Sequence, residues 1–227
     1  MKTKNLHGFP HVPYYHPSDF TAEEVLSQSI SFYELMKKRR SIREFSDKPV
    51  DKKVIENLLK TAGSAPSGAN KQPWTFCAIS NLKLKAQIRK AAEKEEYKNY
   101  HQRMNDQWIK DLAPLATDWH KPFLEKAPWL IVVFRKSYEL EHEKKMTNYY
   151  TSESVGIACG FLISAIHHAG LVTLTHTPSP MNFLSEILER PENEKPFLLL
   201  PVGYPQDEVF VPHISKKGLD DISKFYM

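Results

Sequence analysis

Residues 151–169 are the stretch that most restricts how this chain can fold. They predict a helix that ends before Gly170, and nearly every side of this helix is apolar or small. The residues concerned are Val155, Gly156, Ile157, Ala158, Cys159, Gly160, Phe161, Leu162, Ile163, Ala165 and Ile166. Because a helix without a polar face is buried all round, something must cover each of its sides. In a chain of 227 residues the simplest cover is a partner subunit, so we expect a homodimer.

Short apolar runs alternate with helical patterns along the rest of the chain. Further helices are expected to start at Thr21 and to span residues 52–62, 82–92 and 183–188. Apolar runs, several of them β-branched, predict strands over residues 75–79, 127–134, 171–175 and 197–202. This alternation predicts an α/β or α+β sandwich.

Three segments are expected to lie outside these elements, on a single domain that spans residues 1–227. Residues 1–22 and 206–227 are expected to be terminal arms. Residues 93–125 are polar but carry several Trp and Tyr residues. Polar sequence with large aromatic side chains predicts a lid that becomes ordered over something beneath it.

Charge and cysteine content exclude several classes of function. The 31 basic and 27 acidic residues are mixed along the chain, so no continuous basic face for nucleic acid is expected. Cys77 and Cys159 each stand alone in an apolar segment, which provides neither a disulfide framework nor a metal site and suits a reducing cytoplasm. No apolar run reaches the ~20 residues that span a bilayer. We therefore expect a cytoplasmic protein without membrane, nucleic-acid or metal binding.

Arg39, Arg40 and Arg43 place three guanidinium groups within five residues, with the hydroxyl of Ser41 among them. These groups repel one another unless an anion lies between them, and the planar donors of Arg match phosphate oxygens in pairs. The cluster therefore predicts a phosphate site, and the alternative is a solvated basic end of a helix. Residues 64–74 form a loop of small residues between two prolines, and their backbone N–H groups could approach a flat ligand closely.

Three motifs in this order resemble the flavin-dependent nitroreductase superfamily. They are Arg39–Arg43, the loop from Ala65 to Trp74, and the run from Leu200 to Pro205. Glu96, Tyr100, Trp108, Trp119, Lys121 and the segment 173–178 are similar, more narrowly, to its iodotyrosine deiodinase branch. The resemblance implies an α+β fold with a central, mostly antiparallel sheet flanked by helices. It also implies an intertwined homodimer that holds two FMN molecules at the subunit interface.

The resemblance also assigns residues to the cofactor. Arg39, Arg40, Ser41 and Arg43 would hold the phosphate, ribityl chain and pyrimidine edge of FMN, with Lys216 near the phosphate. Pro66, Ser67, Gly68 and Ala69 would lie on the loop that contacts the flavin, and Thr175 and Thr177 would lie beside its ring system. Asn70 and His176 occupy further cofactor positions at which vertebrate relatives have other polar residues.

The substrate that the resemblance implies is a halogenated tyrosine. Glu96 would bind its ammonium group, Tyr100 would hydrogen-bond to the zwitterion, Lys121 would bind its carboxylate, and the backbone of Ala69 would meet its phenolate. Glu96 and Tyr100 are four residues apart and would share a helix face. The alternative for this pair is a solvated helix without a ligand.

The expected activity is FMN-dependent reductive dehalogenation by one-electron steps through a flavin semiquinone. Thr177, with Thr175 as its alternative, is expected to donate its hydroxyl to flavin N5, and the external electron donor would be NADPH or a reductase. A broad-substrate, NAD(P)H-dependent nitroreductase or flavin reductase is the second hypothesis. A third is a protein that binds flavin or halotyrosine without turnover.

Overall fold

The computed structural model describes residues 3–14 and 19–227. Its contacts divide the chain into two compact units, Met1–Arg39 and Arg40–Met227. The expectation of a single domain over the whole chain stays a prediction. Residues 1–2 and 15–18, which belong to the expected N-terminal arm, lie outside the described residues.

The first unit contains a small hairpin and one helix. Strands β1 (Lys4–Leu6) and β2 (Phe9–His11) pair antiparallel, so the arm expected at residues 1–22 contains a short β-hairpin. Helix α1 (Ala22–Lys37) begins where the sequence predicts. Thr21 caps it: the Thr21 hydroxyl accepts from the Glu24 N–H at 3.3 Å, and the Thr21 N–H donates to the Glu24 carboxylate at 2.8 Å.

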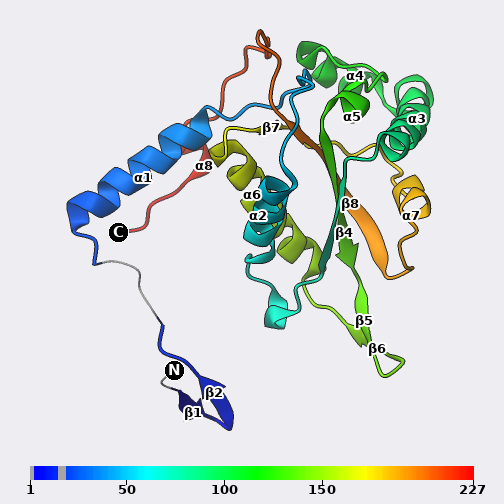
Figure 1. Ribbon diagram of the computed structural model, residues 1–227. Helices are drawn as coiled ribbons and strands as arrows, with labels where there is room; N and C mark the ends of the chain where they lie inside the picture. Colours follow the sequence, from blue (N-terminus) through cyan, green and yellow to red (C-terminus); the bar gives the residue numbers. More distant parts are fainter. Residues whose placement is uncertain (1–2, 15–18) are drawn as a thin grey trace. The chain divides into compact units, whose positions relative to one another are not determined.

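The second unit is organised around a four-stranded sheet (Figure 1). Its order is β3–β4–β8–β7, with every neighbouring pair antiparallel. The strands are β3 (Trp74–Ile79), β4 (Trp129–Lys136), β8 (Glu194–Gly203) and β7 (Val172–Thr173). The predicted central antiparallel sheet is therefore confirmed, although β7 is shorter than the strand expected over 171–175.

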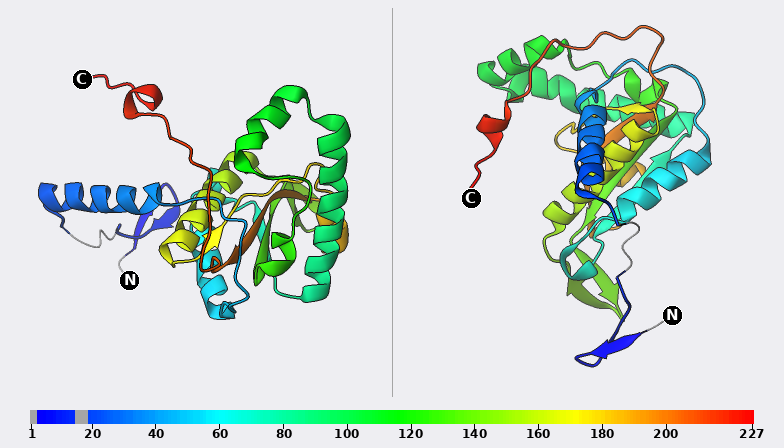
Figure 2. Two further views of the ribbon diagram at one scale, coloured as in Figure 1. Left: turned by 90° about the horizontal axis from the view of Figure 1, so that it is seen from above. Right: turned by 90° about the vertical axis from the view of Figure 1, so that its left-hand side faces the viewer.

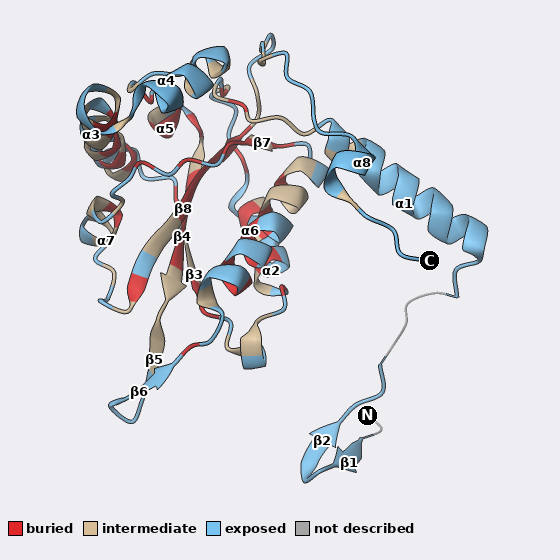
Figure 3. Cartoon of the chain, turned by 180° about the vertical axis from the view of Figure 1, so that it is seen from behind, coloured by how far each residue is buried: buried red, intermediate tan, exposed pale blue. Residues whose placement is uncertain are grey.

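Helices cover both faces of this sheet, as Figures 1 and 2 show. Alternate residues of β4 point to opposite faces. Ile131 and Val133 pack with α2 (Lys52–Gly63) and α6 (Thr151–His168), whereas Leu130 and Val132 pack with α3 (Leu82–Lys98), α5 (Phe123–Lys126) and α7 (Phe183–Ile187). Burial on both sides explains why β4 from Leu130 to Phe134 and β8 from Leu198 to Val202 are continuously apolar rather than alternating, and Figure 3 shows these two strands among the most buried segments. The predicted α+β sandwich is confirmed.

Helix α6 is not buried all round within one chain. Val155, Ala158, Cys159, Leu162 and Ile166 face the core. On the opposite side Gly156 and Gly160 are exposed, together with 44% of Ile157 and 40% of Phe161. One face of the helix that most constrains the fold therefore lacks a cover within the described residues.

The largest differences from expectation lie around the predicted lid, residues 93–125. Helix α3 continues to Lys98 rather than ending at residue 92. A π-helical turn (Asn99–Arg103), α4 (Asp106–Leu112), a 3₁₀ turn (Ala113–Leu115) and α5 complete the segment.

Two smaller features were also not expected. A hairpin of β5 (Tyr138–Glu141) and β6 (Lys144–Thr147) follows β4, and the arm at 206–227 carries the short helix α8 (Leu219–Ile222). Among the described residues, none of the helices combines the length and the apolar character needed to cross a bilayer.

Candidate active site

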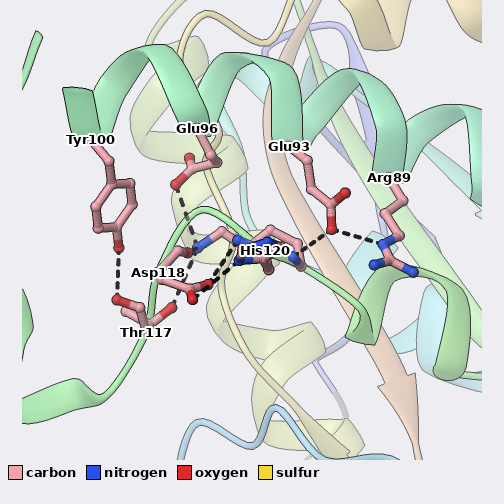
Figure 4. A network of polar contacts seen from close by, with 8 residues as sticks. Arg89, Glu93, Glu96, Tyr100, Thr117, Asp118 and His120 are labelled. Carbon is pink, nitrogen blue, oxygen red and sulfur yellow. Dashed lines mark hydrogen bonds and ion pairs between the residues drawn. The ribbon is translucent and has the colours of Figure 1, made fainter. Parts of the chain in front are cut away.

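The site is built on the inner face of α3. Asn81 caps the start of this helix by accepting from the Leu84 N–H at 3.0 Å, and Ile88 and Ala92 bury it against the sheet layer. Towards its end, Glu96 and Tyr100 point at the loop that carries Thr117 and Asp118 (Figure 4). The expectation that Glu96 and Tyr100 share a face is confirmed.

Glu96 forms a buried ion pair with Lys121. The Glu96 Oε2 and Lys121 Nζ atoms are 3.5 Å apart, and the two residues are only 7% and 4% exposed. Burial raises the pKa of Glu96, and the Lys121 charge opposes the rise. Burial likewise lowers the pKa of Lys121, against the opposing charge of Glu96. Keeping both groups charged in this buried position therefore costs free energy. A bound zwitterion would lower that cost, because its two charges would add a partner to each group.

Tyr100 and Lys121 also hold the loop over α3. The Tyr100 hydroxyl donates to the Thr117 carbonyl at 3.1 Å. The Lys121 ammonium donates to the Thr117 hydroxyl at 3.3 Å and to the Asp118 carbonyl. Burial, with the neighbouring Glu96 charge, raises the pKa of Tyr100, so its hydroxyl stays a donor at neutral pH.

Glu93 is a member of this cluster that sequence reasoning missed. Its Oε1 atom accepts from the Lys121 backbone N–H at 2.7 Å and from Arg89 Nε at 2.8 Å, which fixes the position of Lys121. The spacing could have revealed it, because Arg89, Glu93, Glu96 and Tyr100 follow the i, i+4, i+7, i+11 pattern of one helix face.

Arg43 and His176 lie next to this cluster. Burial lowers the pKa of the half-buried Arg43, with Tyr100 as an opposing neighbour, and no carboxylate pairs with Arg43 in the described part of the chain. Burial and the charges of Lys121 and Arg43 lower the pKa of His176 to about 3, so its ring is neutral. This ring packs edge-on against Phe123 at 5.5 Å between centroids, and its Nε2 is buried without a partner among the described residues.

The segment after Arg39 runs along the edge of the sheet. Ser41 forms a parallel bridge with Thr173, and the Ile42 N–H donates to the Thr173 carbonyl at 3.2 Å. Arg40 donates to the Pro212 carbonyl, which ties the C-terminal arm to this segment. A hollow of about 310 Å³ lies here; its lining includes Ser41, Arg43, Pro114, Ala116, Phe210 and Pro212.

Lys216 is exposed and makes no contact with Arg40 or Arg43 among the described residues. Arg39 belongs to the first unit, so its role at the cofactor stays a prediction.

Thr175 and Thr177 lie on one exposed face, and His176 between them is buried. This follows from the alternation of side chains in extended chain, where the His176 backbone pairs with Leu199 in both directions, at 2.9 and 3.0 Å. Both side chains therefore lie on the same face, and the preference for Thr177 over Thr175 stays a prediction.

The loop from Pro66 to Asn70 is at the other end of the sheet. It leads into Trp74, which pairs with Arg135, whereas Ser41 is joined through Thr173 and Val202 to Trp129. The stretch of β4 from Trp129 to Arg135 spans about 20 Å at the usual strand rise. Figure 1 shows the same separation, with the cyan turn after α2 at the bottom of the unit and β7 near its top. One chain therefore does not bring together the two predicted halves of the cofactor site.

The conformation of this loop is nevertheless well defined. Ala69 and Asn70 have positive φ values of 48° and 52°. The Gly68 N–H donates to the Ser154 hydroxyl at 3.3 Å, and a Cβ atom at Gly68 would lie 3.0 Å from the Tyr150 ring. These contacts dock the loop against the start of α6, next to the exposed face of that helix.

Comparison with known proteins finds a matching family model and several similar sequences. Residues 36–204 match the nitroreductase family model. An iodotyrosine deiodinase of Haliscomenobacter hydrossis is 59% identical over 204 residues, which cover 89% of this chain and 92% of the relative. The iodotyrosine deiodinase of Danio rerio is 47% identical, covering 98% of this chain and 76% of the relative, and iodotyrosine deiodinase 1 of Homo sapiens is 44% identical, covering 93% and 74%.

Solved structures agree with this assignment. The crystal structure of oxidized iodotyrosine deiodinase bound to FMN and 3-iodo-L-tyrosine matches with a TM-score of 0.73 and 31% identity, covering 86% of this chain and all of that one. A nitroreductase-like protein from Streptococcus mutans shares the fold at a TM-score of 0.65 and 16% identity, over 88% of this chain and all of its own. The chain therefore belongs to the nitroreductase family and, within it, to the iodotyrosine deiodinases.

Proposed function

We propose that this protein catalyses the FMN-dependent reductive dehalogenation of halogenated tyrosines, releasing tyrosine and halide. The observation that carries the proposal is the buried Glu96–Lys121 ion pair beside the Tyr100 hydroxyl. A broad-substrate reductase has no need for two buried, opposite charges over its flavin. The relative that was crystallised with FMN and 3-iodo-L-tyrosine supports this choice of ligands.

The amino-acid end of the substrate replaces internal contacts of the lid. Its ammonium group takes the place of the Lys121 cation at Glu96, and its carboxylate pairs with the freed Lys121. Tyr100, which donates to a carbonyl in the free chain, turns its hydroxyl to the zwitterion. Such exchanges are worth far more in a buried site than on a wet surface.

The residues around Arg43 suit FMN. Arg43 is a half-buried cation without a carboxylate partner, and the hollow beside Ser41 gives access to it. Bound FMN supplies the electrons for cleavage of the carbon–halogen bond, which takes up two electrons and one proton. Arg43 and Ser41 would hold the cofactor, and the hydroxyl of Thr177, or of Thr175 as the alternative, would donate to flavin N5. The electrons come from NADPH or a reductase, and the free thiols of Cys77 and Cys159 suit a cytoplasmic location.

Two chains complete each site. The loop from Pro66 to Asn70 lies about 20 Å along the strand from the Arg43 end of the sheet, so it serves the site of a partner subunit. The exposed face of α6, with Ile157 and Phe161, provides the interface next to that loop. The homodimer therefore has two composite sites.

Iodide release tests the activity. The FMN-loaded protein with dithionite should release iodide from iodotyrosine, and removal of the amine or carboxylate of the substrate should abolish binding. If nitroaromatics are reduced but iodotyrosine is neither bound nor dehalogenated, the protein is a broad-substrate nitroreductase. If iodotyrosine binds without turnover, the protein is a binder.

Complementation tests the composite site. Gly68→Val displaces the loop, and Glu96→Gln damages the lid. Two such inactive chains, mixed and reassociated, should recover about a quarter of wild-type activity, because half of the dimers then have one intact site. Recovery would not occur if each chain formed its own complete site.

Thr177→Ala tests the assignment of the hydroxyl. Iodide release should fall by about tenfold or more, as expected for loss of one positioned donor, while FMN affinity changes little. Thr175→Ala is the matched control on the same face. A larger loss with Thr175→Ala would transfer the role to that residue.

A further inference from the structure

The end of α3 changes its helical geometry where the site begins. Residues Asn99–Arg103 form a π-helical turn, and the Met104 N–H donates to the Asn99 carbonyl, five residues back, at 2.9 Å. Turns of this kind inside or at the end of α-helices are frequent at functional sites. Here the turn places Asn99 and Arg103 on one side, and Asn99 is buried.

Both side chains bind one main-chain oxygen of a distant segment. Asn99 Nδ2 donates to the Ser179 carbonyl at 3.0 Å, and Arg103 Nη1 donates to the same oxygen at 3.2 Å. Arg103 Nη1 also donates to Asn99 Oδ1 at 3.0 Å, which fixes the orientation of the amide. We call these two side chains and the Ser179 carbonyl the Ser179 anchor.

The Ser179 anchor joins the two parts of the proposed site. Asn99 follows Glu96 by three residues and directly precedes Tyr100, while Ser179 comes two residues after Thr177. Asn99 also lies near enough to Glu96 to oppose slightly the burial-driven rise in the pKa of that carboxyl. The contact therefore reaches from the group that binds the substrate ammonium to the segment that faces the flavin.

We propose that Asn99 and Arg103 are positioning residues, which through the Ser179 carbonyl fix the amino-acid clamp of Glu96 and Tyr100 relative to the hydroxyls of Thr175 and Thr177. The inference rests on the proposed function and extends it to two residues that touch neither ligand. An amide suits this role because it donates to Ser179 and accepts from Arg103 at the same time.

Asn99→Asp is the sharpest test, because it keeps the size of the side chain but turns its donor into a carboxylate oxygen that faces a carbonyl oxygen. In the FMN-loaded protein we expect iodotyrosine binding, followed by flavin fluorescence, to weaken by about 10- to 100-fold, the range for loss of a buried hydrogen bond. Binding of 2-iodophenol, which lacks the amino-acid end, should stay within about twofold. Iodide release at saturating iodotyrosine should also fall, because the segment of Thr177 loses its support.

Arg103→Gln provides a second variant in case Asn99→Asp fails to fold. Arg103 is partly exposed, so its replacement leaves the core intact, and a smaller loss of about fivefold in iodotyrosine affinity is expected. Lys98→Gln is the matched control: Lys98 shares the Glu95 carboxylate with Arg103, at 2.9 Å, but does not contact Ser179. It should leave iodotyrosine affinity and iodide release unchanged.

The proposal is overturned if Asn99→Asp and Arg103→Gln lower the melting temperature but keep the ratio of iodotyrosine to 2-iodophenol affinity and the saturated rate of iodide release. It is also overturned if Lys98→Gln causes the same loss as Arg103→Gln, because the effect would then come from Glu95. Wild-type protein in the same series reports on the function itself. If the wild type releases no iodide, the proposed function fails, whereas a difference between variants and an active wild type tests the Ser179 anchor alone.

Discussion

Two buried carboxylates of this protein share a similar depth but behave in opposite ways. Glu194 at the start of β8 is 4% exposed, and Glu96 at the end of α3 is 7% exposed. Glu194 accepts from Arg190 Nε at 2.7 Å and from the Thr75 hydroxyl at 2.6 Å. Burial alone would raise the pKa of Glu194, but these hydrogen bonds and the nearby Arg190 and Lys136 charges bring it below its ordinary value.

Glu96 has a looser set of partners. Its Lys121 partner is 3.5 Å away, and burial leaves the pKa of Glu96 above its ordinary value. A buried carboxylate whose hydrogen-bonding capacity is filled by the protein stabilises the fold, and one whose capacity is left open is suited to a ligand. We therefore predict that Glu194 is structural and that Glu96 belongs to the substrate site.

The largest expected effect is the loss of activity in Glu96→Gln. Removing one member of a buried charge pair that binds ligand costs about 3–4 kcal/mol, so kcat/KM for iodotyrosine should fall by about 100- to 1000-fold. FMN affinity should change little. Glu23→Gln, at an exposed position of α1, is the control, and kcat/KM close to wild type in Glu96→Gln would place the ammonium elsewhere.

Glu194→Ala should act on stability instead. The substitution removes two hydrogen bonds and leaves Arg190 without its carboxylate partner. The free energy of unfolding should drop by about 2–3 kcal/mol. This is at the low end for a broken buried ion pair, because the Arg190 side chain is still partly exposed to water. Urea denaturation measures this. Iodide release per folded molecule should be unchanged, and a specific loss of activity would remove the contrast between the two carboxylates.

The double substitution Glu96→Leu with Lys121→Met should give a smaller change of the opposite sign. Replacing a buried ion pair by apolar side chains is often neutral or stabilising, so the free energy of unfolding should rise by about 1 kcal/mol while iodotyrosine binding is lost. Thermal unfolding of the FMN-loaded protein provides the measurement. Marked destabilisation would mean that this pair, like that of Glu194, holds the fold together.

The smallest effect is the pH dependence of stability, and its sign differs between the carboxylates. The pKa of Glu194 is below its ordinary value of 4.5. The stabilisation of the folded state by ionised Glu194 is therefore present above pH 4.5 and is lost as the pH falls through its folded-state pKa. The pKa of Glu96 is above 4.5. The stabilisation of the folded state by protonated Glu96 is therefore present below pH 4.5 and is lost as the pH rises through its folded-state pKa.

Denaturation curves between acid and neutral pH can separate the two. Compared with wild type, Glu194→Gln should lose the acid-sensitive part of its stability, and Glu96→Gln should gain relative stability towards neutral pH. Iodotyrosine affinity should fall as the pH drops through the folded-state pKa of Glu96. Parallel curves for both variants would contradict the assignment.

Much of the fold could be predicted because its signals are local. Helices α1 and α2 start where the sequence predicts, and apolar runs form β3, β4 and β8. The continuation of α3 was missed because residues 93–98 lack an apolar stripe; ion pairs three and four residues apart, such as Arg89 with Glu93, support the helix instead. The β5–β6 turn was missed because His142 and Glu143 adopt positive φ values of 47° and 65°, where Gly or Asn would be the usual signal.

The candidate site shows the same division. Glu96, Tyr100 and Lys121 were predicted to act together, and the structure brings them together. Their supports, Glu93 and the Ser179 anchor, join residues 28 and 80 positions apart, and no local pattern predicts which distant backbone atom a side chain will reach. The separation of the Pro66–Asn70 loop from Arg43 depends on strand register, which also cannot be derived from residue types alone.

The connection between β3 and β4 has an evolutionary consequence. All three side chains proposed to recognise the amino acid lie within residues 93–125, and the hydrogen bonds from Asn99 and Arg103 to Ser179 go to a main-chain oxygen that any residue could offer. If these side chains do select the substrate, this connection is a separate unit that can be exchanged without altering the sheet. Transplanting these residues onto a nitroreductase of the same fold should transfer affinity for iodotyrosine, and a chimera that keeps its flavin but ignores iodotyrosine would show that selectivity is spread more widely.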